Sequence, residues 1–164
     1  MIVVLHDIRS AHNVGSIFRT ADGAGCENLF LCGITPMPLD RFGRPRSDIA
    51  KVALGAETWM PWEYAASCTR LLDRLKKDGY TILALEQNVR SIQYTSFHLS
   101  QKQWQKTALV VGGEVEGLSR AILNRADHII EIPMHGRKES LNVAVAFGIV
   151  AFSLRSSLSS PSAP

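Results

Sequence analysis

The chain alternates between short, continuous apolar runs and segments in which apolar residues recur with helical spacing. The runs are rich in β-branched residues, which is typical of strands buried on both faces of a sheet. Strands are predicted at residues 2–5, 28–32, 81–85, 107–111 and 128–132. Helices are predicted at residues 13–24, 47–54, 67–78, 119–125 and 142–156. This order predicts an α/β fold with a mostly parallel sheet and helices on both faces.

Length and composition fit one globular domain. The chain has 164 residues, of which 46% are hydrophobic and 20% charged, with 12 glycines and 7 prolines. These values exclude a disordered or fibrous protein. We expect one domain over residues 1–155, followed by a flexible tail at 156–164 that is rich in Ser and Pro.

Charge and hydropathy narrow the class of protein further. The 18 Lys and Arg residues exceed the 15 Asp and Glu residues by three, which is compatible with a local basic surface. The apolar run after Met1 is too short for a signal peptide. The run at 141–154 would span about 21 Å as a helix, less than the roughly 30 Å core of a bilayer. We therefore expect a cytoplasmic protein without a membrane segment.

Neither the cysteines nor the histidines suggest a metal site. The 3 cysteines form no CxxC pair, so neither a disulfide framework nor a zinc site is indicated, and they are expected to be small apolar residues in a reducing compartment. The 5 histidines show no HExxH or other ligand spacing. The sequence predicts no bound metal.

Loops that follow strands are where an open α/β sheet binds its ligands. The first leads into the predicted helix at 13–24, with Asn13 at the N-cap position and Arg19 nearly two turns further on. From spacing alone, a simple cap for Asn13 and a solvent-facing Arg19 are favoured. A second loop, residues 33–46, is rich in Pro and Arg and carries Arg41, Arg44 and Arg46, which suit either a solvated loop or contacts to phosphates.

A glycine-rich turn follows the predicted strand at 107–111. Gly112, Gly113 and Gly117 let a ligand approach the backbone closely, but the segment is neither GxGxxG nor a phosphate loop, so a plain turn is an equal alternative. The single acid between the glycines, Glu114, could accept hydrogen bonds from a ribose or hold the loop together.

The last loop connects the strand at 128–132 to the final helix. Ser140 is a good N-cap for that helix, and its small residues, such as Ala144 and Gly148, permit another element to pack closely. A capped core helix explains Ser140 and the small residues, but it does not explain Asn142 at the start of an apolar helix.

The order and spacing of these segments carry more information than each alone. Residues 13–19, then 112–118, then 132–134 with 140–142, resemble the three motifs of the SpoU, or TrmH-like, branch of the SPOUT RNA methyltransferases. Residues 51–56 also resemble a short family segment ending in Gly-Ala, although Leu54 stands where a smaller residue is usual. The likeness extends over nearly the whole chain.

The resemblance implies a C-terminal deep trefoil knot and a bent S-adenosylmethionine bound within it. Cofactor contacts are implied for Leu85, Gly112, Gly113, Ile132, Met134, Ser140 and Leu141. It also implies a homodimer with the active site near the interface, to which the small-sided final helix would contribute. The expected activity is 2′-O-ribose methylation of structured RNA, without a metal.

By motif position, the resemblance implies that Arg19 is the catalytic arginine, with Asn13, Glu114, Ser140 and Asn142 around it. Because a guanidinium stays protonated near neutral pH, we expect Arg19 to bind phosphate and stabilise a developing alkoxide rather than act as a free base. Arg41, Arg44 and Arg46 are expected to contact RNA.

The resemblance favours tRNA as the substrate, with rRNA as the alternative. A noncatalytic RNA-binding module of the same fold is a further alternative, which the presence of Arg19, Glu114 and Asn142 disfavours. The absence of phosphate-binding motifs disfavours an unrelated α/β nucleotide-binding protein.

Overall fold

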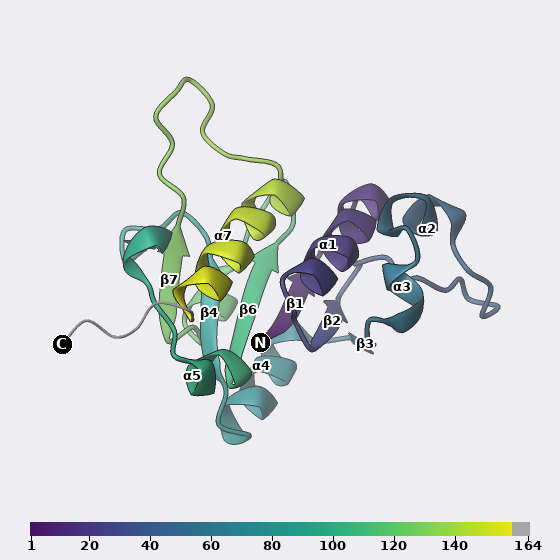
Figure 1. The fold of residues 1–164 in the computed structure, drawn as a ribbon, viewed down its shortest axis with the longest axis horizontal. Coiled ribbons are helices and arrows are strands. Elements are labelled where there is room, and N and C mark those ends of the chain that lie inside the picture. Colours follow the sequence, from purple (N-terminus) through teal and green to yellow (C-terminus); the bar gives the residue numbers. More distant parts are fainter. Residues whose placement is uncertain (159–164) are drawn as a thin grey trace.

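The computed structural model describes residues 1–158 and contains a seven-stranded sheet in the order β3-β2-β1-β6-β4-β7-β5 (Figure 1). The strands are β1 (Ile2–His6), β2 (Asn28–Cys32), β3 (Trp62–Ala65), β4 (Thr81–Leu85), β5 (Ile92–Gln93), β6 (Thr107–Gly112) and β7 (His128–Glu131). All neighbouring strands in this sheet run parallel. Their carboxyl ends therefore lie at one edge, where the loops of interest begin.

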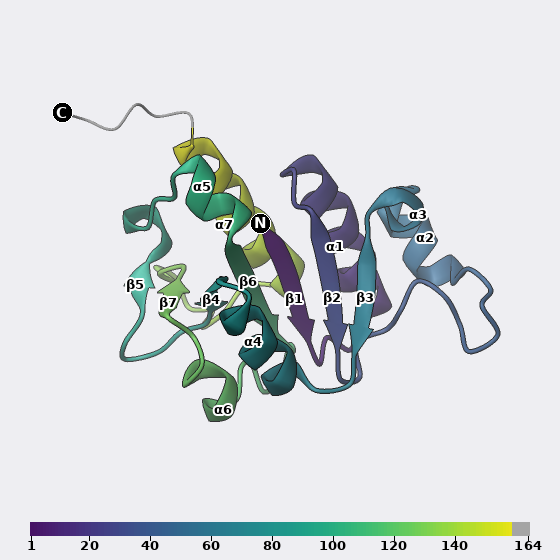
Figure 2. The same ribbon diagram turned by 90° about the horizontal axis from the view of Figure 1, so that it is seen from below.

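Helices cover both faces of the sheet, as Figure 2 shows. One face carries α1 (Ala11–Gly23), α2 (Ser47–Ala53), α3 (Ala56–Trp59), α5 (Gln101–Gln105) and α7 (Val143–Ser157). The other carries α4 (Cys68–Lys77) and α6 (Arg120–Leu123). A 3₁₀ turn, Tyr94–Ser96, follows β5. The predicted α/β fold with a parallel sheet and two helical layers is confirmed.

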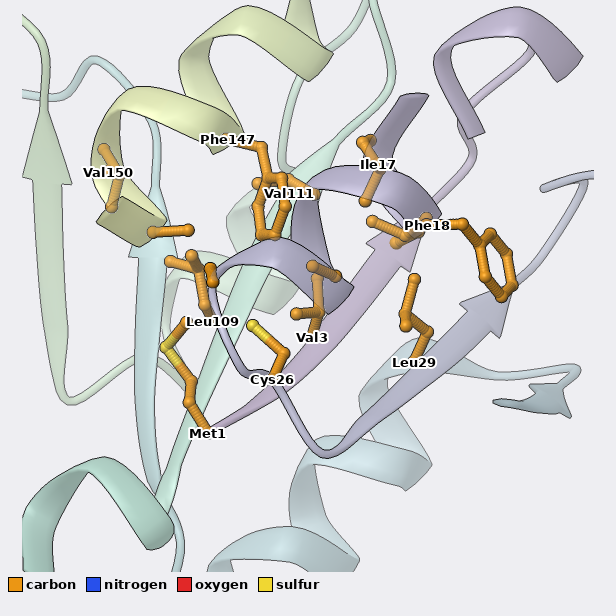
Figure 3. Packing of buried hydrophobic residues seen from close by; sticks show 14 of the residues in the cluster. Met1, Val3, Ile17, Phe18, Cys26, Leu29, Leu109, Val111, Phe147 and Val150 are labelled. Atoms are coloured by element: carbon orange, nitrogen blue, oxygen red, sulfur yellow. The ribbon is translucent and has the colours of Figure 1, made fainter. Parts of the chain in front are cut away.

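Two hydrophobic clusters form the core, one on each face of the sheet. Successive residues of β1 point to opposite faces: Val3 and Leu5 belong to the cluster under α1 and α7, and Ile2 and Val4 to the cluster under α4. Phe147 of α7 is fully buried and packs among the residues of β1 and β6 (Figure 3). Because the central strands are covered on both sides, nearly all of their buried positions are apolar, which made them visible in the sequence.

Two strands and two short helices were not predicted. The edge strand β3 is only half buried, and β5 has two exposed residues, so neither shows a continuous apolar run. The helices α3 and α5 have 4 and 5 residues, too few for helical periodicity to be visible. The remaining strands lie within one residue of their predicted bounds.

The ends of two predicted helices, α1 and α7, change how their residues are assigned. Helix α1 begins at Ala11, because the Ser10 side chain accepts the backbone N–H of Asn13 at 3.2 Å and is the N-cap. Helix α2 begins at Ser47, as predicted, with Arg46 at its N-cap, and Asp48 in its first turn pairs with Arg46 at 2.6 Å. Helix α7 runs to Ser157, so the first residues assigned to the tail form its last turn. The rest of that tail, 159–164, lies outside the described residues.

Leu54, the departure from the family segment, occupies a special backbone position. It ends α2 with a φ of 52°, in the left-handed region where glycine or asparagine is favoured, and its side chain is exposed.

The three cysteines are buried, and none of them forms a disulfide. In the part of the chain that the structure describes, no helix combines the length and hydropathy needed to cross a membrane.

Candidate active site

A cleft of about 630 Å³ opens at the carboxyl ends of β4, β6 and β7. This volume lies within the range of about 300–1,000 Å³ that small-molecule sites occupy. The cleft is lined by all the residues for which cofactor contact was predicted, namely Leu85, Gly112, Gly113, Ile132, Met134, Ser140 and Leu141. Glu114 and Asn142 line it as well. Part of its wall comes from the long loop that rises between β7 and α7 in Figure 1.

The glycine turn after β6 requires residues without side chains. A Cβ atom on Gly112 would lie 2.5 Å from the backbone carbon of Gly117, because the turn folds back on itself. A Cβ on Gly113 would lie 2.5 Å from the carbonyl oxygen of Asp7. Close backbone approach therefore explains both glycines and shapes the floor of the cleft.

Glu86 and Gln87 complete the cleft, and sequence reasoning missed both. The Glu86 carboxylate accepts the backbone N–H of Leu118 at 2.7 Å, and the Gln87 side chain donates to the carbonyl of Glu139 at 2.7 Å. They tie the loop after β4 to the turn after β6 and to the loop before α7. Their only sequence signal was their position directly after the predicted strand at 81–85.

Glu114 fastens the glycine turn to the start of α1. Its carboxylate accepts the backbone N–H groups of Arg9 and Ser10 at 3.1 and 3.4 Å and the Nδ2 group of Asn13 at 2.7 Å. Partial burial raises the pKa of Glu114, but the hydrogen bonds from Asn13 and the backbone outweigh that effect and hold the pKa below its usual value. Of the two roles the sequence left open, the structure shows Glu114 holding the loop.

Asn142 connects the start of α7 to the same contact. Its Oδ1 accepts the backbone N–H groups of Ala144 and Val145, which makes Asn142, rather than Ser140, the N-cap of α7. Its Nδ2 donates to Oδ1 of Asn13 at 3.1 Å. The side chains of Glu114, Asn13 and Asn142 therefore form one hydrogen-bonded chain joining all three motif segments.

Arg19 lies apart from this hydrogen-bonded chain. It is exposed on α1, six residues beyond Asn13 and therefore about 9 Å further along the helix. The residues that line the cleft include neither Arg19 nor Asn13. Within residues 1–158, no carboxylate pairs with Arg19. One chain alone does not bring the predicted catalytic arginine to the cleft.

The charge of the cleft favours a cationic ligand. Its lining contains Glu86, Glu114, Glu116 and Glu131 against Lys138, and apolar side chains such as Met134 fill the space between. Over residues 1–158, no group of three or more His, Cys, Asp or Glu side chains is placed to hold a metal ion. Metal independence stays a prediction.

The predicted RNA-binding arginines lie on the loop between β2 and α2, outside this cleft. Arg44 pairs with Asp40 at 2.9 Å and Arg46 with Asp48 at 2.6 Å. The pKa of Asp40 is lowered chiefly by the backbone N–H of Arg44, with smaller contributions from the backbone N–H of Phe42 and the Arg44 side chain. The pKa of Asp48 is lowered chiefly by its hydrogen bonds from the Arg46 side chain. Arg41 has no carboxylate partner in the described part of the chain.

Comparisons with known proteins agree with this geometry. The sequence model of the SpoU rRNA methylase family matches residues 1–152. An uncharacterized tRNA/rRNA methyltransferase of Synechocystis sp. is 30% identical over 154 residues, which are 94% of this chain and 37% of that protein. The chain thus spans well under two thirds of the length of this curated relative.

Solved structures show the same fold. The A. aeolicus TrmH/SpoU tRNA modifying enzyme has a TM-score of 0.80 and 28% identity, covering 95% of this chain and 74% of that one. An S-adenosylmethionine-bound rRNA methyltransferase from Sinorhizobium meliloti has a TM-score of 0.81 and 28% identity, covering 97% and 57%. An RNA 2′-O ribose methyltransferase has a TM-score of 0.78 and 27% identity, covering 94% and 55%. With its family match over nearly all of its length, the chain belongs to the SpoU rRNA methylase family.

Proposed function

We propose that the protein uses S-adenosylmethionine to methylate the 2′-hydroxyl of a ribose in RNA. The observation that carries the proposal is the cleft, which residues of the second and third motif segments line and to which the Glu114–Asn13–Asn142 hydrogen bonds join the first segment. The likeness to an RNA 2′-O ribose methyltransferase and to other RNA methyltransferases supports the ribose and RNA parts of the proposal.

The residues of the cleft fit S-adenosylmethionine. The glutamates give the lining a negative charge that suits its sulfonium and ammonium groups, and Leu85, Ile132 and Leu141 offer apolar surface to an adenine ring. When bound, the cofactor supplies a methyl group already activated by the sulfonium. The related S. meliloti enzyme, solved with S-adenosylmethionine bound, supports this assignment.

The protein's own residues then have to position the ribose and balance charge. Asn13 donates to Glu114 and accepts from Asn142, and these two hydrogen bonds fix the edge of the cleft. We propose that Arg19 binds an RNA phosphate and stabilises the developing alkoxide, while phosphate or water takes the proton. Transfer RNA is the proposed substrate and ribosomal RNA the alternative. The C-terminal knot stays a prediction of the family resemblance.

The function is tested by methyl transfer to fractionated RNA. Purified protein with methyl-labelled S-adenosylmethionine should label tRNA, and labelling should persist in excess chelator because no metal takes part. Alkaline hydrolysis should leave the label in dinucleotides, since a methylated 2′-oxygen cannot attack the neighbouring phosphate. Label in mononucleotides would show base methylation and overturn the ribose assignment, and label only in rRNA would favour the alternative substrate.

We also propose a homodimer that completes the active site. Val145, Ile149 and Phe152 are exposed large apolar residues spaced along one face of α7. Phe152 lies against Gly23 of α1, the helix that carries Arg19, with 3.5 Å between its ring and a Cβ built on Gly23. Pairing this face with a second copy would bury it beside Arg19 and let one protomer's arginine approach the other's cleft.

Phe152→Glu is expected to convert the dimer to monomers and to reduce methyl transfer. Its ring is 48% exposed in one chain, so the substitution should leave folding intact while placing a charge in the proposed interface. Sedimentation at micromolar concentration measures the change, with Val89→Glu on the fully exposed Val89 as the matched control. A parent protein that is monomeric and fully active at these concentrations would contradict the dimer.

A further inference from the structure

A second groove, of about 550 Å³, lies at the carboxyl ends of β2 and β3 and shares no lining residue with the first cleft. The loop between β2 and α2 forms most of it, and in Figures 1 and 2 this loop extends beyond α2 at the edge of the molecule. Ile34, Leu39, Phe42 and Tyr64 give the groove apolar walls, and Arg41 and Arg46 line it too. The combination of aromatic and cationic side chains distinguishes it from the acidic cofactor cleft.

Phe42 is presented to solvent by an ordered turn. Its side chain is 66% exposed although the turn around it is fixed: Asp40 accepts the backbone N–H groups of Phe42 and Arg44 at 2.8 and 3.0 Å. Gly43 supplies the positive φ of 75° that the turn needs. None of these contacts uses the phenyl ring, so the ring is not required to form the turn.

The charges beside the ring favour an anionic, aromatic ligand. The guanidinium carbons of Arg41 and Arg44 lie 4.7 and 5.0 Å from the ring centroid. Asp40 neutralises Arg44 and Asp48 neutralises Arg46, which leaves Arg41 as the cation of this loop without a carboxylate partner in residues 1–158. Arg41 and the exposed ring of Phe42 could therefore bind one phosphate and one neighbouring base. A duplex, which presents a row of phosphates and no free base, would fit this pair less well.

We propose that Phe42 stacks on an unpaired base of the RNA substrate while Arg41 binds an adjacent phosphate. The inference rests on the proposed RNA methyltransferase function and narrows its substrate to RNA with an unstacked base, since bases within a duplex cannot reach a protein ring. Tyr64, which is exposed and donates its hydroxyl to the Gly33 carbonyl at 3.2 Å, adds a second aromatic ring to the lining of the same groove.

Fluorescence of a 2-aminopurine base in a short RNA tests the stacking, because stacking quenches its emission. With the base unpaired, the parent protein and Phe42→Trp should bind and quench, whereas Phe42→Leu, which keeps the apolar bulk but loses the π face, should bind about tenfold more weakly and quench little. The same RNA paired into a duplex should bind equally to all three proteins. Arg41→Ala should lower the salt dependence of binding by about one phosphate contact.

Unchanged affinity and quenching in Phe42→Leu would overturn the proposal. The proposal would also be overturned if Phe42→Leu, without RNA, sedimented differently from the parent. That result would make the loop an interface between copies of the chain. S-adenosylmethionine binding should be the same in every variant, which verifies folding. If the parent transfers methyl groups normally but Phe42→Leu binds and quenches like the parent, only the stacking inference is wrong. If the parent quenches the unpaired base but transfers no methyl group to RNA, only the proposed function is wrong.

Discussion

Methyl transfer is expected to fall by about a hundredfold or more when Arg19 is replaced by lysine, the scale of losing one transition-state donor. Lysine keeps the positive charge but lacks the planar fork that can hold a phosphate and face a developing oxyanion together. Arg19 is exposed on α1 and has no carboxylate partner within residues 1–158. The substitution should therefore leave stability and S-adenosylmethionine binding nearly unchanged.

Single-turnover assays at saturating RNA separate this chemical effect from binding. Arg9→Lys is a suitable control, because only the backbone N–H of Arg9 contacts Glu114. A lysine variant at position 19 that transferred methyl groups at nearly the parent rate would reduce Arg19 to a long-range electrostatic aid. The catalytic role would then have to move to another group near Asn13 or Ser140.

Gly112→Ala is expected to reduce methyl transfer by a similar factor, through the shape of the cleft rather than through chemistry. The new Cβ would lie 2.5 Å from the carbon and 2.7 Å from the oxygen of Gly117, both backbone atoms that cannot rotate away. The turn would have to move by about an ångström, and a displacement of this size can cost about a hundredfold in rate. S-adenosylmethionine binding should weaken as well, which distinguishes this variant from Arg19→Lys.

Gly136→Ala is the matched control for this substitution. Gly136 lies on the loop before α7, and a Cβ there meets no atom within 4 Å. Calorimetric titration with S-adenosylmethionine and thermal unfolding should therefore show a parent-like Gly136→Ala and a weakened Gly112→Ala. Equal donor affinity in the two variants would remove the glycine turn from the proposed cofactor site.

Much of the fold was predictable because its causes are local. The central strands had to be apolar on both faces, and helix α4 shows the apolar spacing of a helix with one buried side, so both patterns are visible along the chain. The edge strands β3 and β5 escaped prediction because an exposed or two-residue strand has no such pattern. The residues predicted to contact the cofactor came from the order of the motifs, and all of them line one cleft.

The contacts between those residues could not be predicted from the sequence. The hydrogen bond from Asn13 to Glu114 joins positions 101 residues apart, and the one from Asn142 to Asn13 joins positions 129 residues apart. Sequence spacing suggested separate caps, yet Ser10 caps α1 and so leaves the Asn13 side chain free to connect the other two motifs. The central strands and the longer helices could be predicted from the sequence, because their apolar patterns lie along the chain. The tertiary structure decided the partners, because these depend on which strand ends the parallel sheet brings together.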